Sequence, residues 1–149
     1  MQLDRAWIEA HIPHQGRMCL LDSVENWDPQ RISCRSGGHR AADHPLRAHG
    51  RLGAACGIEF AAQAMAVHGA LLADAANIKP LPGFLASVRG VRLHVSRLDD
   101  VQGDLFCDAV RIAGDQRTVL YEFELRCATM RLMSGRATVV LDANRGPDR

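Results

Sequence analysis

A glutamate in an apolar stretch is the residue of this sequence best suited to acid–base chemistry. Glu59 lies between Ile58 and Phe60, and Gln63 follows four residues later, where both side chains would share one face of a helix. Burial among apolar neighbours favours the protonated carboxyl group, because desolvation disfavours its charged form. A neutral carboxyl group can donate a proton to a departing hydroxyl. The structural alternative is a polar pair at the helix end, hydrogen-bonded to loop backbone.

Three histidines precede this glutamate in a segment that predicts a long loop. Residues 37–53 contain four glycines and one proline without an apolar period, and loops of this length inside a domain are usually functional. Imidazole can act as a base near neutral pH, and Pro45 would restrict the backbone of His44 to extended conformations. His39, His44 and His49 could also suggest a metal, but the glycines and Pro45 prevent a common helical face. We therefore expect a histidine base and no metal.

The start of the next helix provides a third chemical group. Backbone N–H groups between Gly53 and Gly57 would lack partners within the helix, and the positive end of the helix dipole lies there. Such groups can polarise a carbonyl oxygen. Acid, base and carbonyl-binding amides would thus meet at one loop–helix junction.

The elements around this junction predict an α+β protein. Residues 54–73 carry apolar side chains on every side, which indicates a helix that is buried all round. A chain of this length buries a whole helix most readily by wrapping a sheet around it. Short turns between strands favour an antiparallel sheet. The predicted strands are 83–98, 104–112, 117–126 and 130–141, with a hairpin of 18–27 and 31–36 and a short helix at 4–10.

Composition and charge describe an ordinary globular protein. Hydrophobic residues make up 47% of the 149 residues, and a net charge of +1 gives no strong field for nucleic acid. We expect one domain over residues 1–142 and a flexible tail at 143–149. The N-terminal segment has no apolar run typical of a secretory signal, and the five cysteines form no C-x-x-C pair, so reduced thiols and a cytoplasmic location are expected.

The predicted helix at 54–73 is long enough to cross a membrane. It contains Glu59, Gln63 and His68, however, and a carboxylate near the middle of a span costs at least about 2.5 kcal/mol. We therefore expect a buried helix and no membrane span.

Four segments together resemble the β-hydroxyacyl-acyl carrier protein dehydratases. IPHQGRMCLLDSVENWD resembles their N-terminal signature, in which a Pro-His pair precedes a hydrophobic stretch ending in Asp. ACGIEFAAQAM resembles the start of their central helix, and GFLASVRGVRLHV and VQGDL resemble the strand and turn that follow. The resemblance covers roughly residues 12–141 and implies the hot-dog fold, a long central helix wrapped by a curved antiparallel sheet. It is closest to the dehydratase-like proteins of aryl polyene and related pigment pathways.

The resemblance also implies roles for individual residues. Glu59 matches the acid of the family, Gln63 its glutamine, and Ala54 the position whose N–H binds the thioester carbonyl; Gly53 and Gly57 would line the same substrate site. His44 matches the catalytic histidine. Two departures accompany it: the loop reads His-Pro-Leu-Arg instead of His-Phe-Pro-Gly, and His44 lies 15 residues before Glu59, one more than is usual.

The implied reaction is removal of water from a 3-hydroxyacyl chain on acyl carrier protein, giving a 2-enoyl thioester without a cofactor. The family supplies the two catalytic residues from opposite chains, which implies a homodimer or a heterodimer with a related hot-dog subunit. A thioesterase and a non-catalytic acyl-binding or partner-stabilising subunit remain the alternatives. The acidic carrier would dock on arginines, and the candidates are Arg47, Arg51, Arg89, Arg92 and Arg97.

Overall fold

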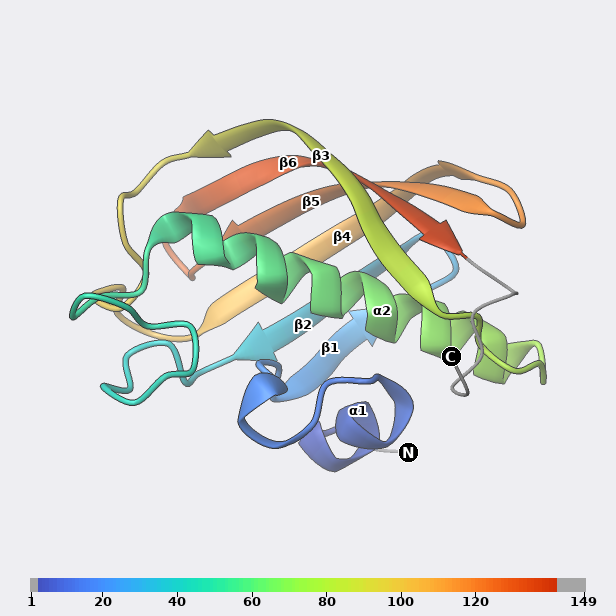
Figure 1. Ribbon diagram of the computed structural model, residues 1–149, viewed down its shortest axis with the longest axis horizontal. Coiled ribbons are helices and arrows are strands. Elements are labelled where there is room, and N and C mark those ends of the chain that lie inside the picture. The colour runs from blue at the N-terminus through green and yellow to red at the C-terminus, as the bar shows by residue number, and fades with distance from the viewer. Residues whose placement is uncertain (1–2, 142–149) are drawn as a thin grey trace.

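The computed structural model describes residues 3–141 as one antiparallel sheet wrapped around one long helix, the predicted hot-dog fold (Figure 1). The strand order in the sheet is β1-β2-β4-β5-β6-β3. The elements are α1 (Arg5–His11), β1 (Ser23–Trp27), β2 (Arg31–Ser36), α2 (Gly57–Ala75), β3 (Gly83–Leu93), β4 (Leu105–Gly114), β5 (Thr118–Arg126) and β6 (Arg131–Leu141), with 3₁₀ turns at Gly16–Met18 and Ala54–Cys56. The predicted tail at 143–149 lies outside the described residues.

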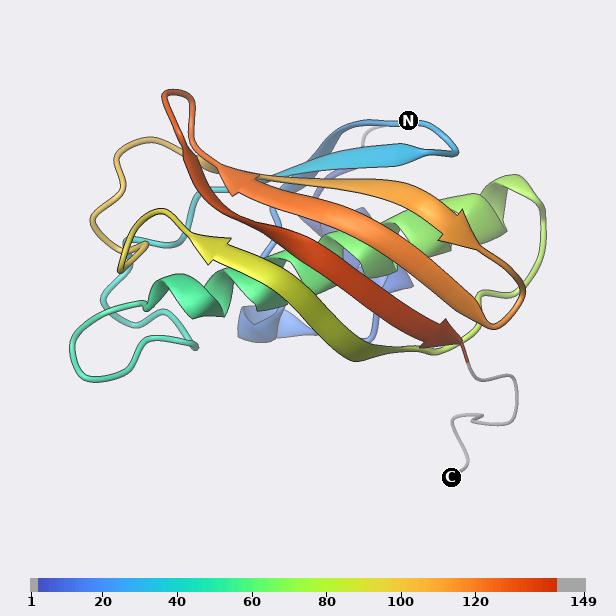
Figure 2. The same cartoon turned by 90° about the horizontal axis from the view of Figure 1, so that it is seen from above.

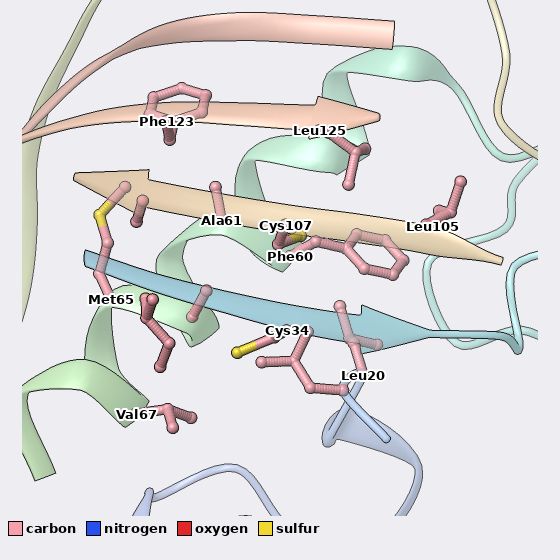
Figure 3. Packing of buried hydrophobic residues seen from close by; sticks show 14 of the residues in the cluster. Leu20, Cys34, Phe60, Ala61, Met65, Val67, Leu105, Cys107, Phe123 and Leu125 are labelled. Atoms are coloured by element: carbon pink, nitrogen blue, oxygen red, sulfur yellow. The ribbon is translucent and has the colours of Figure 1, made fainter. Parts of the chain in front are cut away.

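Small residues allow α2 to lie close against the sheet. Its first residue, Gly57, has so little space that an added Cβ would lie 2.8 Å from Leu125 Cδ2 and 2.9 Å from Met133 Cε. Phe60 and Val67 are completely buried in the same helix, and Figure 3 shows Phe60 between the helix and strands β2 and β4. The helix meets the length and composition of a membrane span, with 56% of that window buried inside the fold.

The sheet presents alternate side chains to the helix, as a half-exposed sheet should. In β5 the buried residues are Val119, Tyr121, Phe123 and Leu125, and the residues between them are exposed or half-buried. Figure 2 shows the strands curving over α2, so that this buried face forms the concave side of the sheet.

Strand β3 differs from the other long strands because none of its residues is buried. It forms one edge of the sheet and pairs only with β6. It is also shorter than the predicted strand at 83–98. The strand ends at Leu93 because the chain beyond it turns to pair with the end of the 37–53 loop. Ala54 N–H donates to Ser96 O at 3.1 Å, and Leu98 N–H donates to Leu52 O at 2.7 Å.

The segment 37–53 contains no helix or strand, as predicted, apart from isolated bridge residues. The hairpin is confirmed for Ser23–Trp27 and Arg31–Ser36, whereas residues 18–22 of the predicted first strand lie before β1, and Met18 ends a 3₁₀ turn. All five cysteines are free thiols, and four of them are buried.

Candidate functional site

Glu59 lies in the first turn of α2. Its side chain is 37% exposed, so the predicted burial among apolar neighbours is only partial. The neighbours Ile58 and Ala62 are also only half-buried, because this face of the helix start is turned away from the sheet. Glu59 is therefore both accessible to a ligand and held by protein groups on one of its oxygens.

Gln63 holds the carboxyl group of Glu59 and is itself completely buried. Its Oε1 accepts a hydrogen bond from Leu20 N–H at 2.9 Å, and its Nε2 donates to Met18 O at 2.7 Å. The same Nε2 donates to Glu59 Oε1 at 3.2 Å. Each end of the amide thus has a partner of the opposite kind, which fixes the NH₂ group toward Glu59.

His14 also contacts this carboxyl group, a role that the sequence reasoning did not assign. Its Nε2 lies 3.2 Å from Glu59 Oε1, and its side chain is 29% exposed. The other ring nitrogen, Nδ1, is buried without a hydrogen-bond partner among the described residues. His14 is the histidine of the Pro-His pair in the N-terminal signature, so a signal was present, although nothing in the spacing connects it to a helix 45 residues later.

His44 lies over the helix start but does not reach Glu59 within the described chain, where no hydrogen bond or ion pair joins them. Its ring stacks near Phe60, with centroids 5.9 Å apart, and its Nδ1 accepts the Leu46 N–H at 3.1 Å. Burial lowers the pKa of His44, and the nearby His39 and Arg17 act in the same direction. Because Nδ1 accepts a hydrogen bond, the neutral ring carries its proton on Nε2.

The other two loop histidines, His39 and His49, make no hydrogen bond or ion pair with Glu59 within the described chain. His39 is completely buried and its Nε2–H donates to Val101 O at 2.9 Å. His49 is exposed and adopts a positive φ of 53° in the turn before Gly50. Within residues 3–141 no group of His, Cys, Asp and Glu side chains could hold a metal ion.

The amides at the helix start are partly occupied, which corrects the assignment of Ala54 as a free donor. Its N–H donates to Ser96 O, and the Gly57 N–H bonds to Ala54 O and Ala55 O. Gly53 accepts the Cys56 N–H on its carbonyl oxygen. Ala55, the next residue, is exposed, and its backbone N–H is the neighbouring amide that a ligand could approach from solvent.

The five candidate arginines fall into two groups. Arg47 and Arg97 both bind the carboxylate of Asp99, a residue that also accepts the Leu52 N–H at 2.9 Å. The hydrogen bond from Arg97 holds the pKa of Asp99 well below its usual range. These two arginines stabilise the loop. By contrast Arg51, Arg89 and Arg92 are exposed and have no side-chain partner within the described part of the chain.

A second polar group lies farther along α2. His68 is completely buried; its Nε2–H donates to Asp28 O and its Nδ1 accepts the Tyr121 hydroxyl, both at 2.8 Å. Burial lowers the pKa of His68 and raises that of Tyr121 to about 12. Both titratable side chains are therefore neutral at physiological pH.

Comparison with known proteins adds a family and a fold. A model of ApeP-like proteins, described as ApeP dehydratase, matches residues 6–145. Comparison with curated proteins gives no match. Among solved structures, the dehydratase heterocomplex ApeI:P from Xenorhabdus doucetiae superposes with a TM-score of 0.82 at 23% identity, covering 92% of this chain and 91% of that one.

Several other structures of the same fold are described as thioesterases. A thioesterase from Pseudomonas aeruginosa has a TM-score of 0.58 at 15% identity and covers 80% of this chain and 79% of its own. A hypothetical thioesterase from Streptococcus pneumoniae, solved with coenzyme A, has a TM-score of 0.56 at 11% identity and covers 83% and 88%. At these identities the likeness concerns the fold alone.

Proposed function

Because this chain belongs to the ApeP-like dehydratase family, we propose that it removes water from 3-hydroxyacyl thioesters carried on acyl carrier protein, in aryl polyene or fatty acid-like synthesis in the cytoplasm. The supporting observation is the carboxyl group of Glu59, which is anchored through one oxygen and open at the other. The C2–H and C3–O bonds break, a C2=C3 bond forms, and the departing hydroxyl takes a proton from Glu59 to leave as water.

Groups near the helix start would hold the thioester and remove the C2 proton. In this proposal a backbone N–H at the exposed Ala55 would bind the thioester oxygen, which gains negative charge as C2 loses its proton. His44 is the base that the resemblance assigns. A second proton on its ring would have to enter at Nδ1, so the Leu46 hydrogen bond would open during the step.

The reaction can be tested by loading a 3-hydroxyacyl chain on acyl carrier protein and measuring the intact mass of the carrier. Loss of water from the acyl chain supports the dehydratase, and loss of the whole acyl chain would show the thioesterase instead. His44→Ala should abolish dehydration at every pH, whereas His49→Ala should leave it nearly unchanged. Full activity of His44→Ala would remove this residue from the reaction.

A second hot-dog subunit is the proposed structural partner. Strand β3 forms an exposed edge, and such edges readily pair with another chain. Its exposed apolar side chains include Leu85, Val91 and Leu93, at 36–49% exposure. The partner is either a second copy or a related subunit, and the assay should therefore be run with and without a co-encoded hot-dog protein. Dehydration that appears only with the partner, and survives His44→Ala, would support the non-catalytic subunit.

The carrier would meet the arginines that the fold leaves exposed. Reversing the charge of Arg51 together with Arg89 should raise KM for the carrier-bound substrate and leave a short pantetheine thioester unaffected. Arg47 and Arg97 are unsuitable for this test, because both stabilise the loop through Asp99. Equal effects on the two substrates would contradict docking at these positions.

A further inference from the structure

The two oxygens of Glu59 have different surroundings. Oε1 lies 3.2 Å from both His14 Nε2 and Gln63 Nε2, and no described residue binds Oε2. The orientation of Gln63 is fixed by Leu20 and Met18, so its contribution to Oε1 is a donated hydrogen bond. The carboxyl group is therefore held from one side only.

The surroundings of His14 indicate which of its nitrogens carries the proton. Nδ1 is buried and has no hydrogen-bond partner among the described residues, and an unpaired N–H in such a place is costlier than a bare nitrogen lone pair. The proton then sits on Nε2, the nitrogen that lies 3.2 Å from Glu59 Oε1. The Gln63 hydrogen bond and the His14 contact both lie on Oε1, which leaves Oε2 as the oxygen that can face a substrate.

We propose that His14 is a positioning residue for Glu59: together with Gln63 it binds Oε1 and thereby reserves Oε2 for proton transfer to the substrate hydroxyl. This inference rests on the proposed dehydration. It also places the acid and its support in one chain, since the N-terminal segment and α2 supply all three side chains. His14 acts through Glu59 and does not contact the reacting atoms.

Kinetics of His14 variants test this role. His14→Ala should lower kcat by about 10- to 100-fold with little change in KM, because a misplaced reacting group loses rate of this order. His14→Gln can present an N–H donor to Oε1 and should retain kcat within about threefold of wild type. The matched control is His11→Ala, since His11 is exposed on α1 and stacks on Trp7, away from Glu59.

A double-mutant cycle separates positioning from a general structural effect. In the Glu59→Gln background, His14→Ala should cost almost nothing further, because His14 acts only through that carboxyl group. Additive losses would overturn the proposal, as would a His14→Ala enzyme with wild-type kcat. A His14→Gln enzyme as slow as His14→Ala would show that His14 itself transfers a proton.

A measurement without turnover keeps the two proposals distinguishable. Nitrogen-15 NMR of the imidazole ring should show His14 protonated on Nε2, with a shift that changes in Glu59→Gln. If wild type fails to dehydrate with or without a hot-dog partner while this signature is present, the proposed function is wrong and the His14–Glu59 contact stands. A proton on Nδ1, or no response to Glu59→Gln, would overturn the inference regardless of activity.

Discussion

Helix α2 carries two polar clusters that differ in how completely their hydrogen bonds are satisfied. The site cluster consists of His14, Glu59 and Gln63 at the start of the helix, and the core cluster of His68 with Tyr121 and the Asp28 carbonyl farther along. In the core cluster both ring nitrogens of the histidine have partners and the side chain is completely buried. In the site cluster Glu59 Oε2 has no partner among the described residues and the carboxyl group is partly exposed.

This difference separates structural polar residues from candidate reactive ones. A buried group whose hydrogen bonds are all made contributes to stability and has no capacity left for a ligand. A group that is anchored at one atom and open at the next has both a fixed position and a free reactive atom. Burial alone would have selected His68, whereas the combination of one anchored oxygen and one open oxygen on a partly exposed side chain selects Glu59.

The largest expected effect is a loss of dehydration rate on substitution of Glu59 in the site cluster. Glu59→Gln should lower dehydration by roughly 10² to 10⁴, because it removes the proton donor while keeping the shape of the side chain. The midpoint of thermal unfolding should stay close to that of wild type. Near-normal turnover in this variant, measured with the carrier-bound substrate, would remove Glu59 from the mechanism.

The core cluster should show the opposite behaviour. His68→Ala leaves the Tyr121 hydroxyl and the Asp28 carbonyl without their partner and should lower the free energy of unfolding by about 2 kcal/mol or more. Tyr121→Phe is the milder variant, with an expected loss of about 1 kcal/mol. Urea titration measures both losses, and kcat of the folded protein should not change. A large fall in kcat at wild-type stability would place His68 in the site.

Gly57 lies where α2 packs closely on the sheet, and the core cluster bridges the same two layers through His68 and Tyr121. Gly57→Ala should be less stable than Gly69→Ala by about 1–3 kcal/mol, because the side-chain ends of Leu125 and Met133 must shift to admit the new methyl group. Gly69→Ala is the matched control in the same helix: an added Cβ there meets nothing within 4 Å, and alanine is the better helix former by up to about 1 kcal/mol. A lower midpoint of thermal unfolding for Gly57→Ala than for Gly69→Ala confirms this reasoning, and equal midpoints contradict it.

The smallest expected effect is a dependence of stability on pH. Burial lowers the pKa of His68, which faces Tyr121, Arg111 and Asp28, so the folded state binds fewer protons than the unfolded chain. Stability should therefore fall as the pH drops through about 6.5, the value of an unperturbed histidine, and level off below the folded pKa. His44 is shifted in the same direction, so the comparison uses wild type against His68→Gln, which should lose less stability on acidification. Equal losses would contradict this account.

Local sequence patterns predicted the fold well, because the spacing of apolar residues follows from which side of each helix or strand is buried. The helix at 54–73, the four later strands and the hairpin follow from apolar periodicity and turn residues, and the structure differs mainly at their ends. The site was predicted in part. Glu59 and Gln63 lie four residues apart in one helix, so their hydrogen bond follows from helix geometry.

The missing parts of the site depend on contacts between distant segments. His14 meets Glu59 only because the N-terminal segment folds back on α2, and no spacing in the sequence shows this. The use of the Ala54 N–H by Ser96 and the binding of Arg47 to Asp99 are likewise tertiary contacts. Chemical type identified the residues that could react, but only the fold shows which of their atoms are already engaged.

The backbone N–H of Leu20 can report on the N-terminal segment through hydrogen exchange in solution. Its proton is bound by the side chain of Gln63 and not by a backbone carbonyl, so it is protected from hydrogen exchange only while the N-terminal segment lies on α2. Its exchange rate therefore measures the opening equilibrium of the segment that also carries His14. A single backbone signal can thus report how often the support of Glu59 comes apart, in a protein that is otherwise folded.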